Sequence, residues 1–261
     1  AHMDIQIAPS GLKEVLLKNV IPSGLSAMIT GAPGIGKSDI IREVGRETGR
    51  EVREFRASMM DPIDSRGLPS IEGGKTTWNI PDTFPRDGEG IIFLDEINTA
   101  TKMMQASLYQ LVLDGKLGDY VVPPGWIVIA AGNRKVDRAI VNDAGTALAT
   151  RFVHLELCVD LDDFTAYAAR EDSDIATEVL AFTRFRPELL HKWSADEKTH
   201  PTPRTWAFVS RLLATKPSRK LALPLYAGCV GEAAAIEFVG FLEIMDRITP
   251  IDQILMDPDG A

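Results

Sequence analysis

The chain has 261 residues, of which 45% are hydrophobic and 25% are charged, as in an ordinary globular protein. The formal net charge of −9 and the pI near 5.0 exclude a surface that is basic all round. This balance disfavours nucleic acid as a partner, although a locally basic channel is compatible with it. The histidines and the two cysteines show no metal-ligand spacing, so we assign them no metal.

Short apolar runs alternate with helical patterns through the first 160 residues or so. The apolar runs predict strands at 25–31, 51–58, 90–98, 125–133 and 151–157. Apolar residues at helical spacing predict helices at 38–47 and 99–115, the second of them stopped by a glycine. Strands that alternate with helices predict an α/β fold with a mostly parallel sheet that helices cover on both faces.

Strand signals end near residue 160, and only helical patterns follow, at 160–172, 173–185 and 202–214. We therefore expect three parts: an N-terminal segment at 1–24 whose first two residues resemble a cloning remnant, an α/β core at 25–159, and an all-helical lid with further helices at 160–261.

The most apolar region, 221–245, is expected to form packed helices. It contains Glu232, Glu237 and Glu243, and three carboxylates make a membrane span too costly. No secretory signal is recognisable near the N-terminus, so the cytoplasm is the expected location.

A long irregular stretch rich in glycine and proline lies between the second and third predicted strands, at 61–85. Gly73 and Gly74 stand between two short polar–apolar runs and predict a hairpin turn. Loops of this length in compact domains usually have a function or lack fixed structure. We treat this stretch as an insert in the core.

A phosphate-binding loop follows the first predicted strand. Gly31, Gly36, Lys37 and Ser38 satisfy the pattern G-x-x-x-x-G-K-[ST], in which backbone N–H groups surround phosphate oxygens. Lys37 supplies charge to the outer phosphates, and the Ser38 hydroxyl is a ligand for Mg²⁺. We expect nine residues to hold the nucleotide: Gly31, Ala32, Pro33, Gly34, Ile35, Gly36, Lys37, Ser38 and Asp39.

Two acidic residues end the third predicted strand. Four apolar residues lead into Asp95, which a strand end would hold rigidly beside Mg²⁺. Glu96 is then placed to activate the attacking water as a general base. Ser38 and Asp95 are therefore the expected metal ligands, and a base beside them favours hydrolysis of ATP.

Three further polar residues are candidates for the same site. Asn133 ends the next predicted strand, where its amide could contact the γ-phosphate or simply form a turn. Arg204 stands in the first turn of the helix that Thr202 and Pro203 begin, where a cation opposes the helix dipole unless an anion lies nearby. Arg151 opens the last strand, and a surface ion pair is the simpler explanation for it.

Taken together and in this order, these motifs resemble an AAA+ ATPase, more closely a MoxR-like member with an insert in helix 2. The resemblance covers residues 10 to 245 or so. It makes Gly31–Ser38 the Walker A loop, and Asp95 with Glu96 the Walker B motif. It also implies that Asn133 is sensor 1 and that Arg204 is the sensor 2 arginine of the lid.

The resemblance further implies a ring, typically a hexamer. Arg151 matches the arginine finger, which acts on ATP held by the neighbouring subunit, and Arg134 and Arg138 are alternatives in the same region. The insert resembles a hairpin that projects toward the pore of the ring. Leu68, Lys75 and Trp78 are then the candidates for contact with substrate or partner. Relatives of this type commonly work with a partner that bears a von Willebrand factor A domain.

The expected function is that of a cytoplasmic, ring-forming, Mg²⁺-dependent ATPase with a chaperone-like role, which remodels, assembles or activates a protein partner. One alternative is a nucleic-acid-stimulated motor or loader on the same fold. The other is an ATP-dependent assembly or regulatory module with little turnover. Stimulation by nucleic acid distinguishes the first alternative, and the effect of Glu96→Gln distinguishes the second.

Overall fold

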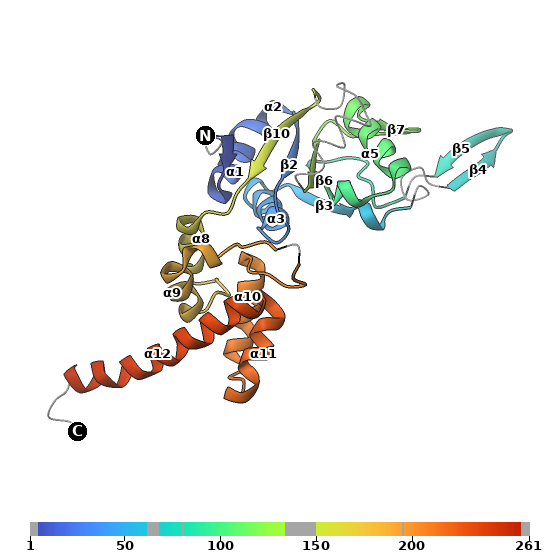
Figure 1. Ribbon diagram of the computed structural model, residues 1–261. Helices are drawn as coiled ribbons and strands as arrows, with labels where there is room; N and C mark the ends of the chain where they lie inside the picture. Colours follow the sequence, from blue (N-terminus) through green and yellow to red (C-terminus); the bar gives the residue numbers. More distant parts are fainter. Residues whose placement is uncertain (1–4, 62–67, 80, 134–149, 195, 257–261) are drawn as a thin grey trace. The chain divides into compact units, whose positions relative to one another are not determined.

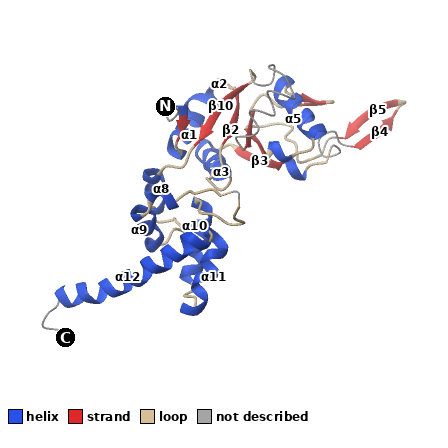
Figure 2. Cartoon of the chain, in the orientation of Figure 1, coloured by secondary structure: helices blue, strands red, loops and turns tan. Residues whose placement is uncertain are grey.

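The computed structural model describes residues 5–61, 68–79, 81–133, 150–194 and 196–256 (Figure 1). The chain divides into two compact units, Ala1–Cys158 and Val159–Ala261, and each is described here by itself. Figure 2 shows that the strands lie in the first unit, whereas the described elements of the second are helices.

A six-stranded sheet organises the first unit, and its order is β1-β10-β2-β9-β6-β3. Each neighbouring pair is parallel. The strands are β1 (Gln6–Ile7), β2 (Ser26–Thr30), β3 (Glu51–Arg56), β6 (Gly90–Asp95), β9 (Trp126–Gly132) and β10 (Phe152–Leu157). All of β9 is buried, which explains its unbroken apolar run, because a strand covered on both faces has no polar side. The predicted α/β fold class is confirmed.

Helices cover the two faces of this sheet. On one face, Met104 and Leu108 of α5 (Lys102–Asp114) are fully buried with Ile92 and Leu94 of β6. Thr101 caps the start of α5 by accepting a hydrogen bond from the Met104 amide at 3.2 Å. Residues alternate along a strand, so the intervening residues of β6 face the other way, where α3 (Lys37–Thr48) contacts β3 and β6.

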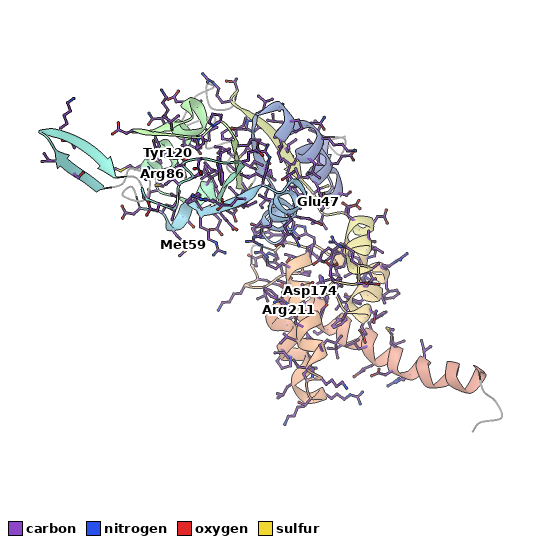
Figure 3. All side chains as sticks on the ribbon, turned by 180° about the vertical axis from the view of Figure 1, so that it is seen from behind. Glu47, Met59, Arg86, Tyr120, Asp174 and Arg211 are labelled. Atoms are coloured by element: carbon purple, nitrogen blue, oxygen red, sulfur yellow. The ribbon has the colours of Figure 1, made fainter. Side chains whose placement is uncertain are left out.

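The N-terminal segment is ordered as α1 (Pro9–Val15), the π-helical turn η2 (Leu16–Val20) and α2 (Ile21–Ser23). It packs on α3, and Lys13 pairs there with Glu43 at 3.1 Å and with Glu47, which is labelled in Figure 3. The hydrogen bond to Glu47 raises the pKa of Lys13 above its ordinary value, although desolvation opposes the shift. The segment is thus part of the first unit's packing.

The insert contains the antiparallel pair β4 (Leu68–Glu72) and β5 (Lys75–Asn79). Gly73 and Gly74 join them with φ of 58° and 77°, a turn that glycine adopts without steric cost. The predicted hairpin is confirmed. Smaller elements complete the first unit: the 3₁₀ turns η3 (Ala57–Met59) and η4 (Ile97–Thr99) and the pair β7 (Lys116–Leu117) and β8 (Tyr120–Val121).

An aromatic cluster fixes the return from the insert to the core. Phe84 is 1% exposed and stacks on Phe55 of β3 with ring centroids 5.0 Å apart. The Tyr120 hydroxyl donates to the Pro85 carbonyl at 2.7 Å, and burial raises the pKa of Tyr120 to about 12. The Trp126 indole likewise donates to a backbone carbonyl of this return, at 2.8 Å. The segment after the hairpin is therefore held on the core.

The regular elements described in the second unit are all helices. Its helices are α8 (Leu161–Ala168), α9 (Thr177–Phe185), the short η5 (Pro187–Leu189), α10 (Pro203–Ala214), α11 (Arg219–Val230) and α12 (Glu232–Met256). Trp206 of α10 is fully buried against Phe182 and Phe238, and its indole donates to the Leu189 carbonyl at 2.8 Å. On the surface, Arg211 lies 3.2 Å from Asp174 (Figure 3). Among the described helices, none has the length and apolar character that crossing a membrane requires.

Candidate nucleotide-binding site

The predicted nucleotide motifs meet at one edge of the sheet. Because β2, β9 and β6 are parallel neighbours, their C-terminal ends lie side by side. The Gly31 amide donates to the Gly132 carbonyl at 3.2 Å, which joins the exits of β2 and β9. Loops that leave the carboxyl ends of parallel strands form the usual ligand crevice of such folds.

The loop from Gly31 to Gly36 has the backbone of a phosphate cradle. A Cβ on Gly31 would lie 2.8 Å from the Ile35 side chain and 3.0 Å from the Leu157 carbonyl, so only glycine fits. Gly34 and Gly36 have φ of 78° and 97°, in the region that glycine favours. When residues of positive φ alternate with residues of ordinary backbone conformation, successive N–H groups point toward a common centre. Ile35 is 6% exposed and anchors the loop in the core.

Lys37 and Asp39 begin α3 immediately after the cradle. The Lys37 ammonium donates to the carbonyls of Gly31 and Ala32 at 2.7 and 2.9 Å, so it lies within the loop. Asp39 accepts from Arg42 at 3.1 Å, and the same guanidinium binds Glu54 of β3 at 2.8 Å. The hydrogen bond to Glu54 raises the pKa of Arg42, which keeps its charge beside the cradle.

Ser38 and Asp95 come together as the sequence predicts for metal ligands. The Ser38 hydroxyl donates to Asp95 Oδ2 at 3.0 Å, although the two residues are 57 apart in the chain. The other carboxylate oxygen accepts from the Glu96 amide at 2.8 Å, which fixes its orientation. One hydroxyl and one carboxylate at this spacing are the oxygen ligands that Mg²⁺ takes in phosphate sites, so the residues fit that ion.

Glu96 has an unusual backbone and an unpredicted partner. Its φ of 54° and ψ of 38° lie in the left-handed region, which costs energy for a residue with a side chain. Its carboxylate Oε2 accepts a hydrogen bond from the Ser58 hydroxyl at 2.8 Å. Ser58 lies in η3, directly after β3. The sequence gives no signal for this contact, because it depends on the register that sets Arg56 of β3 opposite Asp95 of β6.

Asn133 lies at the same edge and is half-buried. It follows Gly132, which is the register partner of Thr30 at the end of β2, so Asn133 stands beside the start of the cradle. Contact of the Asn133 amide with the γ-phosphate stays a prediction. Arg134 and Arg138, the alternative finger residues, lie outside the described part of the chain.

Arg151 lies at the opposite end of the sheet. It precedes Phe152, which pairs with Ser26 at the start of β2, whereas the cradle follows the end of β2. The two positions are separated by the length of the strand, about 20 Å. The Arg151 guanidinium is exposed and donates to the Leu113 carbonyl at 3.2 Å, and within the described residues it has no acidic partner. Arg151 therefore does not reach the cradle of its own chain.

Arg204 belongs to the second unit, in the first turn of α10. Thr202 and Thr205 form a capping box there, and Pro203 occupies the first helical position, so the predicted helix start is confirmed. The Arg204 side chain is exposed and makes no ion pair with any described residue. A cation at this end of a helix is disfavoured unless an anion compensates it.

The three candidate contact residues of the insert lie on the hairpin. Leu68 and Trp78 stand in β4 and β5, where the backbone is described but the side chains are not. Lys75 is exposed, as is Ile71 across the turn, at 80%. The hairpin strands pair only with each other among the described strands.

Comparisons with known proteins bear on the family and the fold of this chain. Residues 27–152 match the model of the family described as "ATPase family associated with various cellular activities (AAA)". The chain is 28% identical over 131 residues to ATPase family gene 2 protein homolog B of Homo sapiens, a match that covers 44% of this chain and 15% of that protein.

The crystal structure of NtrX from Brucella abortus has a similar fold, with a TM-score of 0.51 at 15% identity, over 81% of this chain and 52% of that chain. For NtrX in complex with ADP the TM-score is 0.52 at 16% identity, over 81% and 50%.

Residues 27–152 therefore match the AAA family of ATPases, and the first unit has the P-loop fold of AAA+ proteins. This chain spans about half the length of NtrX and a small part of the human relative. The more specific MoxR-like assignment stays a prediction.

Proposed function

We propose that this chain hydrolyses ATP with Mg²⁺ as part of an assembly of identical subunits, and that the assembly remodels a protein partner. The supporting observation is the position of Arg151 relative to the cradle. An exposed arginine that has no acidic partner among the described residues, a strand's length from its own cradle, is suited to a nucleotide that another copy holds. A head-to-tail arrangement that closes on itself is a ring. By resemblance we propose a hexamer of MoxR-like type with a chaperone-like role.

Each proposed role follows from the position of a side chain. Lys37 binds the outer phosphates from within the cradle, and Ser38 and Asp95 hold the metal, whose positive charge offsets that of the phosphates when it is bound. Glu96 accepts a proton from the attacking water, and Asn133 orients that water or the γ-phosphate. Arg204 is proposed to bind phosphate, because it is a cation in the first turn of a helix and pairs with no acid in the described part of the chain.

Remodelling of a protein is supported by two features. The hairpin of β4 and β5 exposes Ile71 and Lys75, which suits contact with another molecule. The formal net charge of −9 favours a protein over nucleic acid, which attracts basic surfaces. ATPase activity that rises with DNA or RNA, and not with protein, would point instead to the nucleic-acid motor.

The test is a mixing experiment with Lys37→Ala and Arg151→Ala. Each variant alone should be nearly inactive, because an arginine finger contributes about 10³–10⁵ in rate. Random mixing leaves about one interface in four with both residues intact, so activity should return. Arg46→Ala is the matched control, since Arg46 is also exposed and without a described partner. Mass measurements must show that the variants still assemble.

Two outcomes would contradict the proposal. Assembly without recovery on mixing would remove Arg151 as the finger and direct attention to Arg134 or Arg138. Full activity of a monomer would remove the shared site altogether.

A third variant, Glu96→Gln, should bind ATP and hydrolyse it far more slowly. If its turnover equals that of the parent, the chain is an assembly module and not a working ATPase.

A further inference from the structure

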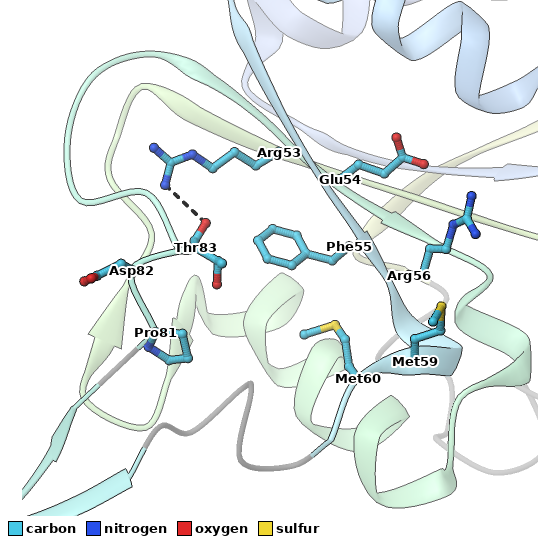
Figure 4. A pocket seen from close by; sticks show the side chains of 9 residues that line it. All are labelled: Arg53, Glu54, Phe55, Arg56, Met59, Met60, Pro81, Asp82 and Thr83. Carbon is cyan, nitrogen blue, oxygen red and sulfur yellow. Dashed lines mark hydrogen bonds between the residues drawn. The ribbon is translucent and has the colours of Figure 1, made fainter.

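A groove of about 570 Å³ runs along the outer side of β3 (Figure 4). We call it the edge groove. Phe55 of β3 and the methionines Met59 and Met60 form its apolar part, and residues 81–83 after the hairpin form the facing wall. Figure 4 shows Arg53 and Phe55 on one side of the strand and Glu54 and Arg56 on the other. The groove therefore opens along the edge of the strand and not over one face of the sheet.

The strand beside this groove has a free edge. β3 is the last strand in the sheet order and, among the described strands, it pairs only with β6. A strand in this position presents backbone N–H and C=O groups that another extended chain can pair with. No proline interrupts Glu51–Arg56. The groove thus offers main-chain pairing along one side and apolar contact next to it.

The apolar part of the groove is unusually accessible. Met59 is 76% exposed, and its side chain stands out from the surface in Figure 3. Methionine side chains adapt to ligands of different shape, so such a surface accepts an apolar side chain without strict shape selection. Phe55 is held from behind by Phe84, which keeps the floor of the groove rigid.

The charges of the groove favour an acidic ligand. Most charged groups that line it already have partners: Arg53 with Glu51, Glu54 with Arg42 and Asp82 with Arg86. Arg56 differs from them, because it is exposed and makes no ion pair with a described residue. The uncompensated charge at the groove is therefore positive, and it lies next to the methionines.

A second copy of β3 fits this edge poorly. In antiparallel pairing, directly opposite residues share a face of the sheet, so the registers with the greatest overlap place Arg53 opposite Arg53 or Glu54 opposite Glu54. Like charges in such a position are destabilising. The edge is thus protected against its own copy while it stays open to a chain of different sequence.

We propose that the edge groove binds an extended peptide segment that carries an apolar side chain next to a carboxylate, and that its occupation acts on Glu96. β3 runs directly into η3, in which Met59 lines the groove and the preceding residue, Ser58, holds the Glu96 carboxylate at 2.8 Å. A ligand that moves Met59 also moves Ser58. The effect on turnover depends on the proposed ATPase function, whereas binding does not.

The test begins with a displayed library of random peptides, selected on the full chain in the presence of ATP and Mg²⁺. Enriched peptides should share an apolar residue with Asp or Glu within two positions of it. Their affinity, measured by fluorescence anisotropy, should fall about tenfold in Arg56→Glu and in Met59→Ser. Arg46→Glu is the control, because it reverses an exposed charge that lies outside the groove and has no described ion-pair partner. Added salt should weaken binding.

Backbone pairing is tested with N-methylated versions of the selected peptide. Only alternate amides of an added strand face β3, so methylation of one alternate set should abolish binding and methylation of the other should spare it. Equal sensitivity of both sets would overturn strand addition. ATP turnover is measured on the same samples, and it should change when the groove is filled.

Three results would overturn the proposal. Library selection could enrich nothing, or the enriched peptides could bind Arg56→Glu and Met59→Ser as tightly as the parent. Alternatively, Arg56→Glu could dissociate an assembly of the parent chain, which would make a second copy the occupant. Peptide binding without any ATPase activity in the parent would refute the proposed function and leave the groove as a peptide site.

Discussion

The contact between Ser58 and Glu96 leads to a specific prediction for Ser58→Ala. The proposed general base, Glu96, must accept a hydrogen bond from the attacking water, and the Ser58 hydroxyl occupies one oxygen of its carboxylate at 2.8 Å. Removal of the hydroxyl frees that oxygen. We therefore expect basal ATP turnover to rise in the variant, with little change in nucleotide affinity, because Ser58 does not belong to the phosphate cradle.

The size of the effect follows from the exposure of the pair. Hydrogen bonds to charged groups contribute about 1.5–3 kcal/mol, and the Glu96 side chain is exposed, so the contribution lies below this range, at about 1 kcal/mol. That free energy corresponds to about a fivefold change in the fraction of carboxylate released. The assay is steady-state phosphate release at saturating ATP, with kcat and KM determined separately.

The matched control is Ser58→Thr, which keeps the hydroxyl and should keep the parent rate. A fall in turnover in Ser58→Ala would refute the reasoning, since it would mean that Ser58 holds Glu96 in its working position. Unchanged turnover in both variants would refute it too, because the contact would then have no part in the reaction.

Four further variants test the packing of the two units. Gly31→Ala should lose nucleotide binding, and its free energy of unfolding should fall by about 1–3 kcal/mol, because the added Cβ meets a backbone carbonyl that cannot move away. Gly240→Ala is its counterpart in α12, where a Cβ meets nothing within 4 Å, and it should stabilise by about 0.5–1 kcal/mol. Tyr120→Phe should cost about 1 kcal/mol through the lost hydrogen bond. Trp206→Ala should cost about 3–5 kcal/mol and unfold the second unit first.

Urea unfolding followed by circular dichroism measures all four. The raised pKa of Tyr120 sets the direction in which stability changes with pH, because the folded state holds the phenol proton more tightly than the unfolded state does. Its contribution is complete below a pH of about 10 and is lost as the pH rises toward about 12. The free energy of unfolding should therefore fall more for the parent than for Tyr120→Phe over this pH range. An equal loss of stability in both proteins would contradict the reasoning for Tyr120. A loss of stability in Gly240→Ala would contradict the prediction for that glycine.

Much of the fold was predictable because local signals and tertiary structure agree. The P-loop pattern and the apolar runs around it define strands and helices that the structure confirms, and Gly73-Gly74 correctly predicts the hairpin. Thr202 and Pro203 correctly predict the start of α10. At the site, the pairing of Ser38 with Asp95 was expected from the motifs, since the two metal ligands of a P-loop protein must meet.

Other features could not be predicted from the sequence. β1 is only Gln6–Ile7, too short to show any periodicity, and it becomes a strand by pairing with β10. The contact of Ser58 with Glu96 depends on the register of β3 against β6, which the side chains of both strands determine together. The position of Arg151 at the far end of the sheet likewise depends on strand order and direction, which the local sequence does not determine.

With Glu96 as the proposed general base, its left-handed backbone places stability and activity in conflict. A non-glycine residue in this conformation costs about 1 kcal/mol, and glycine would relieve that cost. Selection of this protein for heat resistance alone should therefore enrich glycine or asparagine at position 96 and, with it, catalytically dead variants. Engineers who seek a more robust form would have to screen for turnover at every round. In nature, a glutamate kept there despite its cost would mark a chain whose hydrolysis is under selection.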